Sequence, residues 1–153
     1  MERTSSESEL KTALAALETS LSTPILSGEL VGWVAEVQKA WEAASAEIRE
    51  NVTNLHPTQY EEMAEEDQEL LPQIEQLKAE DEAIEADRER IGQMVERDAQ
   101  HVPKLEPDEA KAQKHVQNLI DDGLAFVQRV RKQEVAVSTW LVEAFNRDRG
   151  AGD

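Results

Sequence analysis

Apolar residues recur at alternating steps of three and four along most of this chain, and that spacing places them on one face of an α-helix. One such seam reads Ile74, Leu77, Asp81, Ile84, Arg88, Ile91 and Val95. A later seam reads Val116, Ile120, Gly123, Val127, Val130, Glu134, Val137, Leu141 and Phe145. Apolar and polar residues alternate nowhere for more than a few positions, so no strand is expected. The sequence therefore predicts an all-α protein.

Two acidic residues, Asp81 and Glu134, stand on these seams where apolar side chains are expected. Burying a charge between helices is costly unless the charge is paired or bound to an ion. Arg88 and Arg131 lie on or beside the same seams and could neutralise the two acids. We therefore predict a buried polar network of Asp81, Arg88, Arg131 and Glu134. A weak cation site and simple exposure at the seam edge are the alternatives.

The ends of the helices are marked by proline, glycine and polar residues. His56-Pro57 should end the second helix, because the residue before a proline avoids the α conformation. Pro72 should kink or split the third helix, and Val102-Pro103 should close it. The expected helices cover about residues 6–21, 28–55, 58–100 and 107–147.

Short connections between long helices favour antiparallel neighbours. The length of 153 residues suits one domain with one core. We therefore expect residues 1–153 to form a single antiparallel up-down four-helix bundle, with residues 1–6 and 149–153 frayed.

The chain is strongly acidic, with a formal net charge of −17. Residues 61–100 hold 15 acids and 4 bases, so most of this charge is local. Such a charge disfavours nucleic acid and anionic membranes as partners. The absence of cysteine excludes disulfides and thiolate metal sites. Without a signal-peptide pattern or an apolar run of about 20 residues, a cytoplasmic protein is expected.

The segment from Leu71 to Asp81 resembles the hemerythrin-like (HHE cation-binding) family, in which a Leu/Phe-Pro leads into a helix carrying a Glu-His pair. Glu80-Asp81 takes the place of that pair here, with Asp81 where the histidine would stand. His56, with Glu61 five residues later, resembles the preceding histidine-and-carboxylate segment. The run from Gln133 to Asp148 is similar to the closing helix of some bacterial members. The resemblance covers most of the chain from Trp33 onward.

The resemblance implies a helical bundle and, in members with the full ligand set, two irons held by about five histidines and two bridging carboxylates. This chain has three histidines in total, and the first expected helix has none. We therefore expect no metal centre and no cofactor.

Each of the three histidines also has an interpretation of its own. His56 is interpreted as a histidine at a helix C-terminus, where the helix dipole favours it. Asp98 and His101 have the carboxylate-x-x-His spacing of di-iron carboxylate bundles, but one copy of a motif that is needed twice makes a poor metal site. His115 is interpreted as a surface or boundary residue. No simple helical register brings the three together.

No arrangement of nucleophile, base and orienting group is visible, so the sequence predicts a non-enzymatic protein. The expected role is structural or protein-interacting, with an unknown protein partner and a possible homodimer. One alternative is a ligand or metal-ion sensor built on a remodelled polar core around Asp81 and Glu134. A weaker alternative is a di-iron oxygen-binding protein.

Overall fold

The computed structural model describes residues 2–105 and 109–151, and all of its regular structure is helical. The elements are α1 (Glu2–Ser22), α2 (Leu30–Glu50), the π-helix η1 (Asn51–Leu55), α3 (His56–Glu66), the 3-10 helix η2 (Gln68–Leu70), α4 (Leu71–Leu105) and α5 (Glu109–Ala151). The described residues contain no strand, which confirms the all-α prediction.

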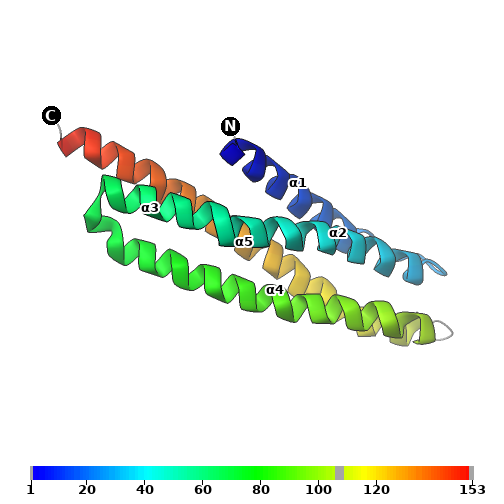
Figure 1. Cartoon of the computed structure of the whole chain (residues 1–153). Helices are drawn as coiled ribbons and strands as arrows, with labels where there is room; N and C mark the ends of the chain where they lie inside the picture. The colour runs from blue at the N-terminus through cyan, green and yellow to red at the C-terminus, as the bar shows by residue number, and fades with distance from the viewer. Residues whose placement is uncertain (1, 106–108, 152–153) are drawn as a thin grey trace.

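Four long helical rods make up the described structure, since α2, η1 and α3 follow one another without a break (Figure 1). α4 packs against α2 and α5, while α1 packs against α2 and α5. α3 extends the second rod along α5. Every rod therefore contributes one face to a common interior.

The apolar interior is divided into two clusters along the rods. The larger cluster holds buried residues of α1, α2, α4 and α5, including Leu14, Trp41, Ile84 and Phe126. The smaller cluster is made by Tyr60, Met63, Leu70, Ile74, Leu77, Val137 and Ala144. On α4 the two clusters are separated at Asp81, which lies between Leu77 and Ile84 in sequence. A polar layer therefore interrupts the core.

The prediction that His56-Pro57 ends a helix is wrong, because the chain continues as α3 from His56 onward. The preceding turn widens into η1, where the His56 N–H donates to the carbonyl of Asn51, five residues back. Pro57 has no N–H and its ring would crowd the preceding turn of a regular α-helix. The wider π turn relieves this conflict. Thr58 therefore lies within the continuous helix and not at its start. Its hydroxyl donates to the Asn54 carbonyl at 3.1 Å.

Helix α3 ends at Glu66, and the backbone of Asp67 is extended, with φ −154° and ψ 100°. The Asp67 carboxylate accepts from the Glu69 N–H at 3.0 Å and so begins η2. Pro72 is the second residue of α4, a position where its missing N–H is harmless.

Pro103 does not close α4, contrary to expectation, because the helix runs through it to Leu105. The expected start of the last helix at Pro107-Asp108 lies outside the described residues. The same holds for Met1 and for residues 152 and 153, so the fraying expected at both ends stays a prediction.

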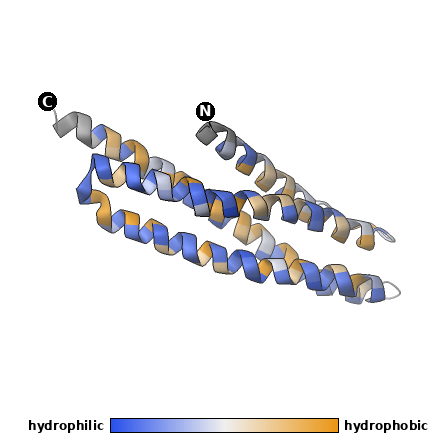
Figure 2. Ribbon diagram, in the orientation of Figure 1, coloured by the Kyte–Doolittle hydropathy of each residue, from blue (hydrophilic) through white to orange (hydrophobic). Residues whose placement is uncertain are grey.

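The seam of α5 is rotated slightly from the expected one. Leu119, Phe126 and Gln133 are buried, whereas Phe145 is exposed. Hydrophilic residues dominate the visible faces of α3 and α4, in agreement with the concentration of acids in residues 61–100 (Figure 2).

Candidate functional site

A buried histidine joins three rods at the boundary between the two apolar clusters. His56 is 1% exposed. Its Nδ1 lies 3.0 Å from both carboxylate oxygens of Asp81 on α4, and its Nε2 lies 2.8 Å from Oε1 of Glu134 on α5. One imidazole ring therefore bridges the two seam acids that the sequence singles out.

Two neutral groups complete the hydrogen bonds of Asp81. The Tyr60 hydroxyl donates to Asp81 Oδ2 at 2.6 Å. The side-chain N–H groups of Gln133 donate to Asp81 Oδ1 at 3.0 Å and to the Leu77 carbonyl at 2.9 Å. Each carboxylate oxygen of Asp81 thus accepts from a neutral donor as well as from His56. We call His56, Tyr60, Asp81, Gln133 and Glu134 the His56 network.

The π turn sets the direction of the His56 side chain. Ile48, His56 and Tyr60 are all buried, at steps that are multiples of four residues. In a regular α-helix each four-residue step overshoots one turn by about 40°, so Tyr60 would face about 120° away from Ile48. The extra residue held in η1 removes most of this drift. His56 and Tyr60 consequently stay on the inner face, with ring centroids 5.8 Å apart.

The charges around His56 favour the imidazolium form. Burial alone would lower the pKa of His56, but the hydrogen bonds and negative charges of Asp81 and Glu134 raise it to about 9. Burial, together with the contact to Asp81, raises the pKa of the Tyr60 hydroxyl well above its ordinary value, so Tyr60 acts as a neutral donor. At neutral pH both His56 nitrogens carry protons and both are engaged.

With both nitrogens protonated and hydrogen-bonded, His56 is not available as a metal ligand or as a base. An imidazolium that donates from both nitrogens has no lone pair for a metal ion and cannot accept a proton as a general base. Among the residues that the structure describes, no group of three or more histidine or carboxylate side chains is placed to hold a metal ion.

The prediction that Arg88 and Arg131 neutralise Asp81 and Glu134 is wrong. Arg88 donates to both oxygens of Glu85 on its own helix, at 3.0 and 2.8 Å, and to the Ser45 hydroxyl at 2.9 Å. Arg131 pairs with Glu18 of α1 at 2.7 Å. A long guanidinium on a seam edge reaches the nearest surface carboxylate, whereas the short acids point inward and meet His56.

Glu134 also faces an open groove between α1 and α5. Its side chain is 24% exposed. The groove has a volume of about 810 Å³. Its lining residues come from two helices and are Glu7, Leu10, Lys11, Leu14, Arg131, Glu134, Val135, Ser138, Thr139, Val142 and Glu143. Glu134 therefore connects the buried His56 network to this open groove.

A second polar cluster lies near the far end of α4. Asp98 is fully buried, and its Oδ1 lies 3.1 Å from Nε2 of His115 and 3.3 Å from Nε of Arg97. The rings of His101 and His115 are 6.2 Å apart, so two of the three histidines do meet, which the sequence did not indicate. Burial raises the pKa of Asp98, while Arg97 and His115 oppose that rise.

Three members of the His56 network were not predicted from sequence: His56 itself, Tyr60 and Gln133. The interpretation of His56 as a residue at a helix end failed because the helix continues through it. One signal in the sequence could have indicated them. His56 and Tyr60 are four residues apart, and a widened turn before them places both on the side that continues the buried face of α2.

Comparison with known proteins gives no relative: no family model, no curated protein and no solved structure matches this chain. Within the described ranges no helix combines the length and apolar character needed to cross a membrane.

Proposed function

We propose that this protein is a non-enzymatic interaction module whose α1–α5 groove receives an amphipathic helix of a protein partner. The observation that carries the proposal is the groove itself, where the exposed Val135 and Val142 of α5 lie among polar side chains beside the His56 network. Its α5 wall spans residues 131–143, which corresponds to about 18 Å of helix. That length matches three or four turns of a bound helix.

The apolar side chains of the groove have the spacing that a helix recognises. Val135 and Val142 are seven residues apart on α5 and are 67% and 56% exposed. Ser138 and Thr139 lie between them on the same stripe. A partner helix in such a groove places its own apolar residues at positions i, i+3 or i+4, and i+7.

Charge favours a basic partner. Three acids, Glu7, Glu134 and Glu143, line the groove against two cations, Lys11 and Arg131, and the chain as a whole carries −17. Of these acids, Glu134 also accepts from His56. Of the lining cations, Arg131 is already paired with Glu18. A helix with lysine or arginine on its polar face therefore complements the rim, whereas a second copy of this acidic chain would add like charge.

A second candidate function, ligand sensing, is favoured by the position of Glu134. Its Oε1 accepts from His56 while its side chain borders the groove. A cation entering the groove would compete with His56 for the same carboxylate. Occupancy of the groove would then be coupled to the protonation of the core.

The proposal also covers how the four helices are arranged. We propose an antiparallel up-down bundle of hemerythrin-like type, with the third helix kinked or split near Pro72 and without the di-iron centre. The motif around Leu71–Asp81 and the single-histidine polar core support this assignment. A cytoplasmic location fits the acidic composition.

The proposal is tested with a synthetic helical peptide that carries leucine at heptad a and d positions and lysine elsewhere. A peptide of identical composition with scrambled order is the control for charge alone. Fluorescence anisotropy should show at least tenfold tighter binding of the patterned peptide. Val135→Glu with Val142→Glu should remove this preference, while Leu26→Glu, a comparably exposed apolar site outside the groove, should not.

Two results would contradict the interaction role. Equal binding of both peptides would show attraction by charge alone. A wild-type dimer in analytical ultracentrifugation that the double valine variant dissociates would assign the groove to a second copy of this chain.

A further inference from the structure

A second hollow lies between the α2–η1 rod and α4 and shares no lining residue with the α1–α5 groove. Its volume is about 500 Å³. It is lined by Trp41, Glu42, Ser45, Ala46, Arg49, Glu50, Thr53, Asn54 and Arg88. Two of its lining residues are arginines, in a chain with 16 bases against 33 acids.

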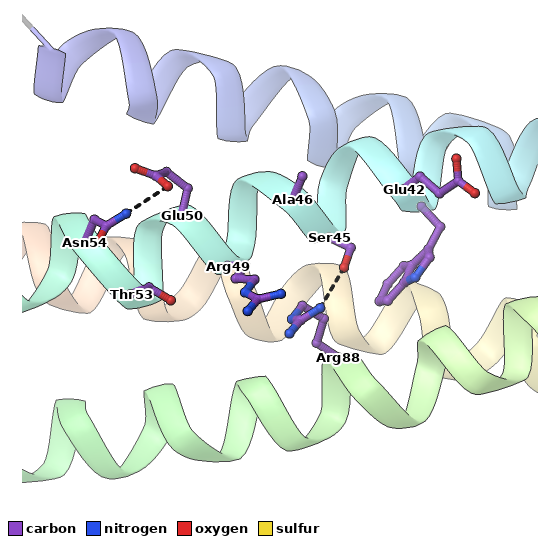
Figure 3. A pocket seen from close by; sticks show the side chains of 9 residues that line it. Glu42, Ser45, Ala46, Arg49, Glu50, Thr53, Asn54 and Arg88 are labelled. Atoms are coloured by element: carbon purple, nitrogen blue, oxygen red, sulfur yellow. Dashed lines mark hydrogen bonds between the residues drawn. The ribbon is translucent and has the colours of Figure 1, made fainter.

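The two arginines are directed toward each other. Figure 3 shows Arg49 from α2 and Arg88 from α4 meeting in the space between these helices. Like charges at close range repel unless an anion lies nearby. Glu85 supplies that anion for Arg88, through hydrogen bonds of 3.0 and 2.8 Å.

Arg49 lacks such an anion. Among the residues that the structure describes, none forms a hydrogen bond or an ion pair with the Arg49 side chain, which is exposed and lines the hollow. Five guanidinium N–H donors are therefore available beside an arginine whose charge is already matched. The Arg49 guanidinium is therefore free to pair with an anion that enters the hollow.

The acids that line the hollow do not supply this negative charge. In Figure 3, Glu42 and Glu50 point away from the space between α2 and α4, whereas Ser45, Arg49 and Thr53 lie on the side of the rod that faces α4. The Glu50 carboxylate accepts from the Asn54 side chain at 2.9 Å. The donors thus converge on the hollow and the carboxylates do not.

The remaining wall is aromatic. Trp41 lines the hollow, is nearly buried and packs against Phe126 with ring centroids 5.6 Å apart. An apolar ligand body in the hollow would contact the small part of Trp41, 6% of the residue, that the core leaves exposed. The planar fork of arginine matches a carboxylate through two parallel hydrogen bonds.

We propose that this hollow binds a small organic monocarboxylate, with its carboxylate on Arg49 and the hydroxyl of Ser45 or Thr53, and its apolar body against Trp41. A dianion such as phosphate is a poorer fit, because Glu85 already neutralises Arg88 and the whole chain is acidic. The hollow is independent of the groove proposed for protein interaction, so either assignment can fail alone.

The experiment is titration of the full chain with phenylacetate by isothermal titration calorimetry and by chemical-shift mapping of the tryptophan indole N–H signals. We expect saturable binding and a shift of the Trp41 signal. Arg49→Gln should weaken binding at least tenfold. Arg129→Gln is the matched control, since it changes the net charge equally but removes a guanidinium that contacts Glu80 on another face. Benzyl alcohol, which lacks the carboxylate, should not bind.

Three outcomes would overturn the proposal. Arg49→Gln could bind phenylacetate as wild type does, which would place the ligand away from Arg49. Arg129→Gln could weaken binding equally, which would show that the loss follows the net charge and not the Arg49 guanidinium. Inorganic phosphate could displace phenylacetate at equal concentration, which would make the hollow a general anion site. Trp41→Phe keeps an aromatic core residue and should lower affinity without removing the Arg49 dependence.

Discussion

The Nδ1 atom of His56 lies 3.0 Å from both oxygens of the Asp81 carboxylate, which ties the π turn of one rod to the seam of another. This pair is buried, and Glu134 holds the opposite nitrogen of the same ring. The stability of the bundle should therefore depend on the proton that His56 carries.

We predict that the folded state loses stability as pH rises from about 6.5 to above 9. The folded-state pKa of His56 is raised to about 9, from an ordinary value of 6.5. Its contribution is thus complete below the unfolded pKa and disappears above the folded one. At 1.36 kcal/mol per pKa unit the contribution is roughly 3 kcal/mol. Urea unfolding at pH 6.5 and pH 9.5 measures it.

The control for this prediction is His56→Gln, which cannot titrate in that range. Its unfolding free energy should change much less between the two pH values than that of wild type. An NMR titration that finds His56 neutral at pH 7.5 would contradict the assignment of an imidazolium.

We predict that Asp81→Leu is far more damaging than Tyr60→Phe. Removing Asp81 leaves the His56 charge with one partner and strands the Tyr60 hydroxyl and one of the two Gln133 N–H donors, at a cost of about 3–5 kcal/mol. Removing the Tyr60 hydroxyl deletes one hydrogen bond of a carboxylate that keeps its other donors, at a cost of about 1–2 kcal/mol. Chemical denaturation of the two variants gives the order directly. Similar midpoints would mean that water replaces the lost partners.

We predict that protein purified without chelators contains no stoichiometric iron. Both nitrogens of His56 are engaged by carboxylates, so metal binding there would require loss of protons and of two hydrogen bonds. Elemental analysis by mass spectrometry tests this. Two irons per chain with an oxo-bridged absorption spectrum would restore the oxygen-binding alternative.

We predict that Ile84→Ala lowers the unfolding free energy by about 2–5 kcal/mol, because Ile84 is buried in the larger cluster. Glu65→Ala should change it by less than about 0.5 kcal/mol, since Glu65 is exposed on α3. Urea midpoints of the two variants provide the comparison, and equal midpoints would place Ile84 outside the core.

The helical character of the chain and most of its core could be predicted from residue spacing. Leu77, Ile84 and Ile91 are buried as the seam of α4 requires, and Asp81 lies among them. Periodicity succeeds here because α4 is uninterrupted over the seam. It also identified both acids of the network, since a charge in an apolar stripe is visible without a structure.

The partner of those acids could not be predicted, for two physical reasons. His56 precedes a proline, and local preference for a helix end outweighed the possibility of a widened turn. The choice between His56 and Arg88 as partner for Asp81 depends on side-chain reach across helices, and spacing within one helix carries no such information. Gln133 was missed because its neighbour Glu134 already occupied the expected seam position.

The widened turn η1 also bears on how this chain tolerates changes in its length. A π turn contains one residue more than an α-helical turn. Removing that one residue would therefore leave α2 and α3 in the same orientation relative to each other. Loss of one residue between 51 and 55, accompanied by Pro57→Ala, would leave an unbroken α-helix that still presents the same sides to the bundle. Loss of one residue elsewhere in α2 or α3 would turn everything beyond it by about 100°. The segment that orients His56 is therefore also the place where this rod can accept a deletion.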